Sequence, residues 1–198
     1  MKVNCDKEGI EKASQIINQG GIAVFPTDTV YGIGCNPYNK DAVRKIYDIK
    51  SRDVSKPLPV LVYSKEIAER IAFFDEFAKK IVEKFWPGPL TIILKLTDES
   101  LKKSLNVTGK IAIRVPNHKC TLELLKKCNF LVGTSANISG HPSFTNPDEC
   151  SNNIQKYDVF VDGGIISSKA ESTIIEIENQ EIKIIREGSL SHKEILGL

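Results

Sequence analysis

Three cations within seven residues give the sequence its clearest candidate for an anion-binding site. Lys50, Arg52 and Lys56 lie in the segment 50–57, between a predicted helix and a predicted strand. The planar guanidinium of Arg binds phosphate oxygens in pairs, and the Lys ammonium supplies a movable point charge. Cations at the end of a helix also complement the helix dipole, so a structural helix end is the competing interpretation.

Two segments rich in hydroxyl groups follow predicted apolar strands. Residues 26–32 (PTDTVYG) come after the strand GIAVF, and residues 133–140 (GTSANISG) come after the strand FLV. Ser, Thr and Asn supply donors and acceptors, and Gly lets a ligand approach the backbone. Because open α/β sheets bind ligands where strands end, both segments are candidate walls of a polar site. A capped turn is the alternative for the first segment, and a tight loop for the second.

Two further strands bring charged or polar residues to the same candidate site. Alternate strand residues share a face, so Lys110, Ala112 and Arg114 of KIAIRV are expected to point together. A buried Arg needs an anionic partner, which a substrate carboxylate or a structural Asp or Glu would supply equally well. Ser172 begins the predicted strand STIIEIE, and Arg186 ends the predicted strand EIKIIRE. A lone Arg is usually a surface cation, which is the alternative for Arg186.

The elements that must position these residues alternate between helical and strand patterns. Periodicity and caps predict helices over residues 9–19, 41–49, 64–73, 75–85, 121–128 and 147–157, with a short helix or frayed end after 190. Apolar runs predict strands over residues 21–25, 58–63, 90–96, 110–115, 130–134, 159–164, 172–178 and 181–187. The last two strands are expected to form a hairpin over Asn179-Gln180. This order predicts an α/β domain with an open twisted sheet.

Composition excludes several classes of protein. The 198 residues include 27 basic and 25 acidic side chains, so whole-chain charge gives no argument for a dedicated nucleic-acid binder. Five cysteines without a CxxC pair predict reduced thiols in a cytoplasmic protein rather than a disulfide framework or a zinc site. Neither a signal peptide nor a membrane span is predicted. The Rossmann and P-loop glycine motifs are missing, and so is any evident Ser-His-Asp or Cys-His set.

Six stretches together resemble the YrdC family of threonylcarbamoyl-AMP synthases. They are PTDTVYGIG, KSRDVSKP, WPGPLT, IAIRVP, TSANISG and the pair STIIEIE and IIREGS, in family order between residues 21 and 189. The resemblance implies a twisted open mixed sheet flanked by helices, with a large concave cavity. It also implies the short form of the family, a single domain over residues 1–198 whose motif-covered core is about 8–190.

The resemblance implies a reaction as well. L-Threonine, bicarbonate and ATP would give threonylcarbamoyl-AMP and pyrophosphate, with Mg²⁺ carried on the ATP phosphates and no metal ligand from a side chain. The product would pass to a tRNA threonylcarbamoyl transferase complex, which modifies the adenosine next to the anticodon. Two alternatives stay open: an RNA-binding relative without synthase activity, and an enzyme that makes another carbamoyl adenylate. Weak RNA binding by the synthase itself is compatible with the sequence.

Position by position, the resemblance implies the roles of fourteen residues. Lys50 and Arg52 would be catalytic through charge neutralisation, and Arg114 would bind the amino acid carboxylate. Some relatives carry His at the position that Leu61 occupies here. The predicted ATP contacts are Arg52, Lys56, Lys110, Ser135, Ala136 (through its backbone), Asn137, Phe144 and Arg186. The predicted threonine contacts are Thr29, Leu61, Arg114, Thr134 and Ser172.

Overall fold

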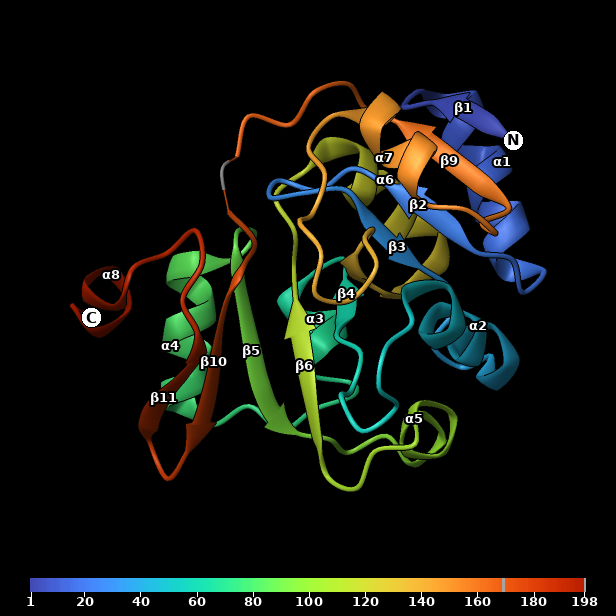
Figure 1. The fold of residues 1–198 in the computed structure, drawn as a ribbon. Helices are drawn as coiled ribbons and strands as arrows, with labels where there is room; N and C mark the ends of the chain where they lie inside the picture. The colour runs from blue at the N-terminus through green and yellow to red at the C-terminus, as the bar shows by residue number, and fades with distance from the viewer. Residues whose placement is uncertain (169, 198) are drawn as a thin grey trace.

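The computed structural model describes residues 1–168 and 170–197, which form helices and strands in mixed order (Figure 1). Seven of the eight helices in these residues begin after a Ser, Asp or Asn whose side chain accepts a backbone N–H. Each such cap stabilises its helix by about 1 kcal/mol. The helices are α1 (Lys7–Asn18), α2 (Lys40–Lys50), α3 (Lys65–Ala68), α4 (Glu76–Phe85), α5 (Glu99–Leu105), α6 (Lys119–Cys128), α7 (Pro147–Asn153) and α8 (His192–Leu196).

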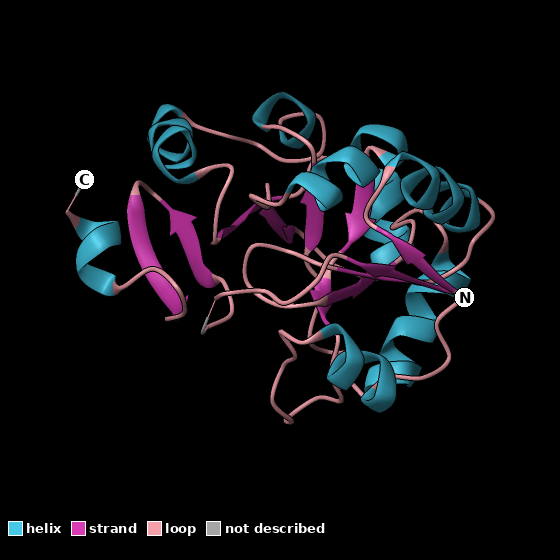
Figure 2. Ribbon diagram, turned by 90° about the horizontal axis from the view of Figure 1, so that it is seen from above, coloured by secondary structure: helices cyan, strands magenta, loops and turns pink. Residues whose placement is uncertain are grey.

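The strands are divided between two mixed sheets. The five-stranded sheet has the order β1 (Lys2–Asn4), β9 (Val159–Asp162), β2 (Ala23–Phe25), β3 (Gly32–Gly34) and β8 (Thr134–Ser135). The six-stranded sheet has the order β11 (Glu181–Arg186), β10 (Thr173–Glu178), β5 (Leu90–Lys95), β6 (Lys110–Arg114), β4 (Val60–Val62) and β7 (Phe130–Val132). Helices lie on both sides of the strands when the molecule is seen from above (Figure 2).

Gly133 joins the two sheets, because it is the single residue between β7 and β8. A Cβ at this position would lie 2.3 Å from Cγ of Leu61, so any larger residue here would force the side chain of Leu61 on β4 to shift. The backbone N–H of Val132 donates to the carbonyl of Cys35 at 2.9 Å, which ties the end of β7 to the segment after β3. The backbone N–H of Gly133 donates to the carbonyl of Pro59 at 3.0 Å, so the polar segment that follows β7 begins beside the residue that precedes β4.

The predicted mixed α/β class is confirmed, and so is the hairpin between β10 and β11. Asn179 and Gln180 at its turn have φ of 52° and 62°, the positive values that a tight hairpin turn requires. The single sheet of the sequence prediction is instead two sheets. The elements β1, β3, β8 and α5 were missed because their sequences, KVN, GIG, TS and ESLKKSL, contain too few apolar residues to establish an apolar run or a period.

The prediction that all five cysteines are free is wrong for two of them. Cys5, before α1, and Cys120, on α6, form a disulfide with a Cα–Cα distance of 5.6 Å. The packing of α1 against α6 brings these residues together although 115 positions separate them, which sequence spacing cannot reveal. Cys35, Cys128 and Cys150 are free, as predicted. Among the described residues, no helix has the length and apolar character needed to cross a membrane.

Candidate functional site

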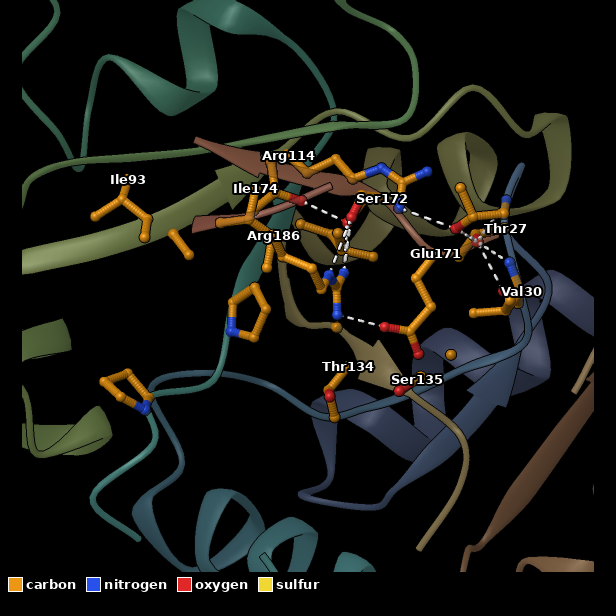
Figure 3. Close-up of a pocket in the computed structure, with 18 of the residues that line it drawn as sticks. Thr27, Val30, Ile93, Arg114, Thr134, Ser135, Glu171, Ser172, Ile174 and Arg186 are labelled. Carbon is orange, nitrogen blue, oxygen red and sulfur yellow. Dashed lines mark hydrogen bonds and ion pairs between the residues drawn. The ribbon is translucent and has the colours of Figure 1, made fainter. Parts of the chain in front are cut away.

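A cavity of about 280 Å³ opens where strands of both sheets end, and Figure 3 shows the residues around it. This volume lies just below the roughly 300–1,000 Å³ of typical small-molecule sites, so the expectation of a large cavity stays a prediction. Nine of the fourteen predicted site residues line it. They are Thr29, Arg52, Leu61, Lys110, Arg114, Thr134, Ser135, Ser172 and Arg186.

Arg114, at the end of β6, is the most deeply fixed cation of the cavity. Its Nη2 donates to Oδ1 of Asp28 at 2.6 Å, Nη1 to Oγ1 of Thr29 at 3.1 Å, and Nε to the carbonyl of Gly88 at 2.9 Å. Burial lowers the pKa of Arg114, and the neighbouring Asp28 opposes that shift. A structural Asp is therefore the partner in this structure, and two of the five N–H groups of the guanidinium remain for a ligand.

The segment 26–32 is a capped turn, as the structural interpretation of its sequence predicted, and it also lines the cavity. Oγ1 of Thr27 accepts the backbone N–H groups of Thr29 and Val30 at 3.1 and 3.2 Å and donates to the carbonyl of Val30 at 2.7 Å. The hydroxyl of Thr121 on α6 donates to the carbonyl of Pro26. These bonds hold the hydroxyl of Thr29 in place beside Arg114.

Arg186, at the end of β11, holds the start of β10. Its Nε and Nη2 donate to the carbonyl of Ser172 at 3.2 and 2.8 Å, and Nη2 also donates to Oγ of Ser172 at 3.2 Å. Its Nη1 pairs with the carboxylate of Glu171 (Figure 3). Oγ of Ser172 lies 2.9 Å from Oγ1 of Thr91 on β5. Arg186 therefore lines the cavity and also holds Ser172, another residue of the cavity lining, in place.

Lys50, the last residue of α2, is buried behind the cavity rather than in its lining. Its ammonium donates to the carbonyls of Ser135 and Asn137 and to Oδ1 of Asn137, the last two at 2.8 and 3.1 Å. These three acceptors take all three N–H groups of the ammonium. Burial, followed by the charge of Arg52, lowers the pKa of Lys50 to about 8, and Glu171 opposes the shift. The structure therefore shows Lys50 supporting the segment 135–137, and its contact with phosphate stays a prediction.

The remaining predicted nucleotide contacts are divided between the cavity and its surroundings. Arg52 lines the cavity, with Nε donating to the carbonyl of Lys56 at 3.0 Å and Nη2 to that of Pro57 at 3.2 Å. Lys110 also lines it and pairs with Glu176 and Glu178, whose hydrogen bonds raise the pKa of Lys110.

Four predicted nucleotide contacts do not line the cavity. Lys56 is exposed, and Asn137 binds Lys50 through its side chain. The backbone N–H of Ala136 donates to the carbonyl of Tyr31 at 2.8 Å, and the carbonyl of Phe144 accepts the N–H of Tyr31 at the same distance. Contacts of these four residues with a nucleotide stay predictions.

Sequence reasoning assigned no site role to two carboxylates that the structure places here. Asp28 binds Arg114, and Glu171 lines the cavity beside Arg186. Asp28 lies inside the polar segment 26–32, and Glu171 directly precedes Ser172, so both stood next to residues already selected. Oppositely charged partners for the two arginines were the signal that could have identified them.

Comparison with known proteins identifies the family of this chain. The family model Sua5/YciO/YrdC, described as "Telomere recombination", matches residues 15–188. The chain belongs to the Sua5/YciO/YrdC family. A relative from Methanocaldococcus jannaschii is 42% identical over 187 residues, which are 92% of this chain and 86% of that protein.

Two further matches come from Pyrococcus abyssi, one with a named protein and one with a solved structure. A protein named threonylcarbamoyl-AMP synthase is 33% identical over 189 residues, 94% of this chain but only 56% of that protein. The structure of P. abyssi Sua5 complexed with L-threonine matches with a TM-score of 0.94 and 31% identity. That match covers all of this chain and 60% of the Sua5 chain, so this chain spans little more than half of the Pyrococcus proteins.

Proposed function

We propose that this Sua5/YciO/YrdC family chain is an L-threonylcarbamoyl-AMP synthase. The observation that carries the proposal is the convergence of Arg114, Thr29 and Ser172 with Arg52 and Arg186 around one cavity. The first three residues offer a guanidinium and hydroxyl groups to an amino acid, and the two arginines offer charge to phosphates. The relatives named threonylcarbamoyl-AMP synthase and the Sua5 structure with L-threonine support this assignment of ligands.

The proposed reaction joins L-threonine, bicarbonate and ATP into threonylcarbamoyl-AMP, pyrophosphate and water. The amine of threonine takes up carbon dioxide derived from bicarbonate, and the resulting carbamate oxygen attacks the α-phosphate of ATP. The bond between the α- and β-phosphates breaks, and pyrophosphate leaves. The protein's part is to hold the carbamate and the α-phosphate together and to stabilise the charge on the phosphates, because no covalent intermediate is required.

Individual residues of the cavity fit these tasks. The two free N–H groups of Arg114 would bind the α-carboxylate of threonine, and Asp28 would keep the guanidinium aimed at it. The hydroxyl groups of Thr29 and Ser172 would orient the amino acid. Arg52 would bind the phosphates with the N–H groups that it does not use on the 56–57 backbone.

Magnesium would accompany ATP rather than occupy a cage built by the protein. The described residues contain no group of three or more His, Cys, Asp or Glu placed to hold a metal ion. We expect Mg²⁺ to bind the phosphate oxygens of ATP, with most of its remaining positions filled by water. A tRNA threonylcarbamoyl transferase complex in the cytoplasm would consume the product.

Calorimetry with ATP, with L-threonine and with both ligands tests the proposed binding site. The proposal requires saturable L-threonine binding that L-valine, which lacks the hydroxyl group, does not reproduce. An Arg114→Lys variant should lose most of the threonine affinity because a lysine cannot supply the planar fork. RNA binding that weakens steeply with salt, together with no threonine binding, would instead identify an RNA-binding member of the family.

A further inference from the structure

The two ion pairs at the cavity differ in how much of each side chain is exposed to solvent. The pair between Arg114 and Asp28 is buried, with side-chain exposures of 7% and 14%. The pair between Arg186 and Glu171 is partly open to solvent, with side-chain exposures of 42% and 29%. A buried pair is costly to break, whereas an exposed pair contributes little and exchanges partners readily. Arg114 is therefore fixed, and Arg186 can change its anionic partner.

Glu171 adjoins predicted contacts of both ligands. It directly precedes Ser172, a predicted threonine contact, and it pairs with Arg186, a predicted nucleotide contact. In Figure 3 its carboxylate projects into the cavity on the side of Thr134 and Ser135. Its charge acts on Lys50 as well, whose ammonium binds the carbonyl of Ser135. The carboxylate therefore contacts Arg186, a predicted nucleotide contact, and projects toward Thr134, a predicted threonine contact.

Among the described residues that line the cavity, Glu171 is the sole carboxylate. A bound triphosphate would compete with it for Arg186, since both are anions that need the same guanidinium. The ammonium group of a bound threonine needs an anionic partner in the cavity. Asp28 cannot be that partner, because it is already paired with Arg114. A Glu171 released from Arg186 would supply that anion.

We propose that Glu171 is a positioning residue that couples the two substrates. In the empty protein its carboxylate neutralises Arg186. When the ATP phosphates bind Arg186, the carboxylate moves to the ammonium group of threonine and holds the zwitterion before the carbamate forms. Binding of either ligand then raises the affinity for the other, because the carboxylate cannot pair with Arg186 and with the ammonium group at the same time. The inference rests on the proposed function and adds a residue and an order of events to it.

The test is a thermodynamic cycle in the full chain, with α,β-methylene-ATP and Mg²⁺ so that no transfer occurs. Isothermal calorimetry gives the Kd of L-threonine with and without saturating analogue, for the wild type, Glu171→Gln and Glu187→Gln. Glu187 is the matched control, because it is exposed and adjacent to Arg186 in the sequence. Thermal unfolding of each variant checks that the fold is retained.

The wild type and Glu187→Gln should bind threonine at least about fivefold more tightly when the analogue is present, a coupling typical of linked sites. In Glu171→Gln the coupling should fall below about twofold, and the analogue alone should bind as tightly as to the wild type or more tightly, since its competitor is gone. Undiminished coupling in Glu171→Gln, or two ligands that bind the wild type without coupling, would overturn the inference alone. A wild type that binds neither ligand would overturn the proposed function itself.

Discussion

Asp28 and Arg114 form an ion pair of 2.6 Å that joins the turn after β2 to the end of β6, and so joins the two sheets. Neither side chain has more than 14% of its surface exposed. The pair sets the position of the guanidinium before any ligand arrives. A rigid cation at this point is what the proposed capture of an amino acid carboxylate requires.

Replacing Asp28 by Asn should therefore destabilise the protein strongly. The change preserves shape but leaves the buried charge of Arg114 without its counter-ion, which costs about 3–5 kcal/mol of unfolding free energy. Urea denaturation of the wild type and Asp28→Asn gives this difference directly. Glu8→Gln is the control, because Glu8 pairs with Lys12 at an exposed site and should cost no more than about 0.5 kcal/mol. A loss of less than about 1 kcal/mol in Asp28→Asn would contradict the role assigned to the pair.

Lys50 should give the protein a distinctive pH dependence. Burial lowers its pKa from the ordinary value of 10.5 to about 8, so between these values the unfolded chain binds more protons than the folded chain. The contribution of Lys50 to the unfolding free energy must therefore rise as pH increases from about 8 to about 10.5. In this range the buried ammonium loses its proton, and the folded protein no longer has to bury a charge.

The difference in unfolding free energy between the wild type and Lys50→Met isolates this contribution. Across that pH window the unfolding free energy of the wild type should rise by on the order of 2–3 kcal/mol relative to that of Lys50→Met. A difference that does not change with pH would show that the ammonium is not buried in solution.

Much of the site was predictable because it is carried by short polar segments at the ends of apolar strands. Thr29, Thr134 and Ser135 were selected for that reason, and Ser172 was selected because it begins a predicted strand; all four line the cavity. Lys110 and Arg114 were expected on one strand face, and both line the cavity. The sequence could not show that Lys50 turns inward to bind three protein oxygens, because the burial of a helix end depends on tertiary packing.

In the fold, too, features set by neighbouring residues could be predicted, whereas contacts between distant parts of the chain could not. Helices with clear periods and Asx or Ser caps were found, and so was the hairpin with two residues of positive φ at its turn. The short strand β3 was missed because its three residues, Gly32–Gly34, pair with β2 and β8 and have no period of their own. The contact between Cys5 and Cys120 was missed because it joins distant parts of the chain.

The disulfide between Cys5 and Cys120 should be detectable by thiol counting. Titration of the unreduced protein in denaturant should find three free thiols out of five, and reduction should raise the number to five. Because the bridge closes a loop with a sequence separation of 115, its loss in Cys5→Ser should lower the unfolding free energy by about 2–4 kcal/mol. Cys128→Ser, at a free thiol, is the control. Five thiols before reduction would contradict the bridge.

Removing the guanidinium of Arg52 should slow catalysis strongly while leaving the fold intact. Arg52→Ala loses two hydrogen bonds to exposed backbone at residues 56 and 57, a modest cost in stability. It also loses a cation proposed to bind the phosphates, which should lower kcat by about 10²–10³-fold. Pyrophosphate release measures the effect, and Arg44→Ala, at an exposed position of α2, should keep full activity. A fully active Arg52→Ala would remove Arg52 from the mechanism.

The most direct measurement of the central claim is product formation with each substrate left out in turn. The purified protein is incubated with Mg²⁺ and ATP, with or without L-threonine and with or without bicarbonate in carbon dioxide-free buffer. Mass spectrometry follows the adenylate, and a coupled assay follows pyrophosphate. The account predicts threonylcarbamoyl-AMP and pyrophosphate in equal amounts only when all three substrates are present. Pyrophosphate release that does not depend on threonine, or no adenylate in the complete mixture, would contradict it.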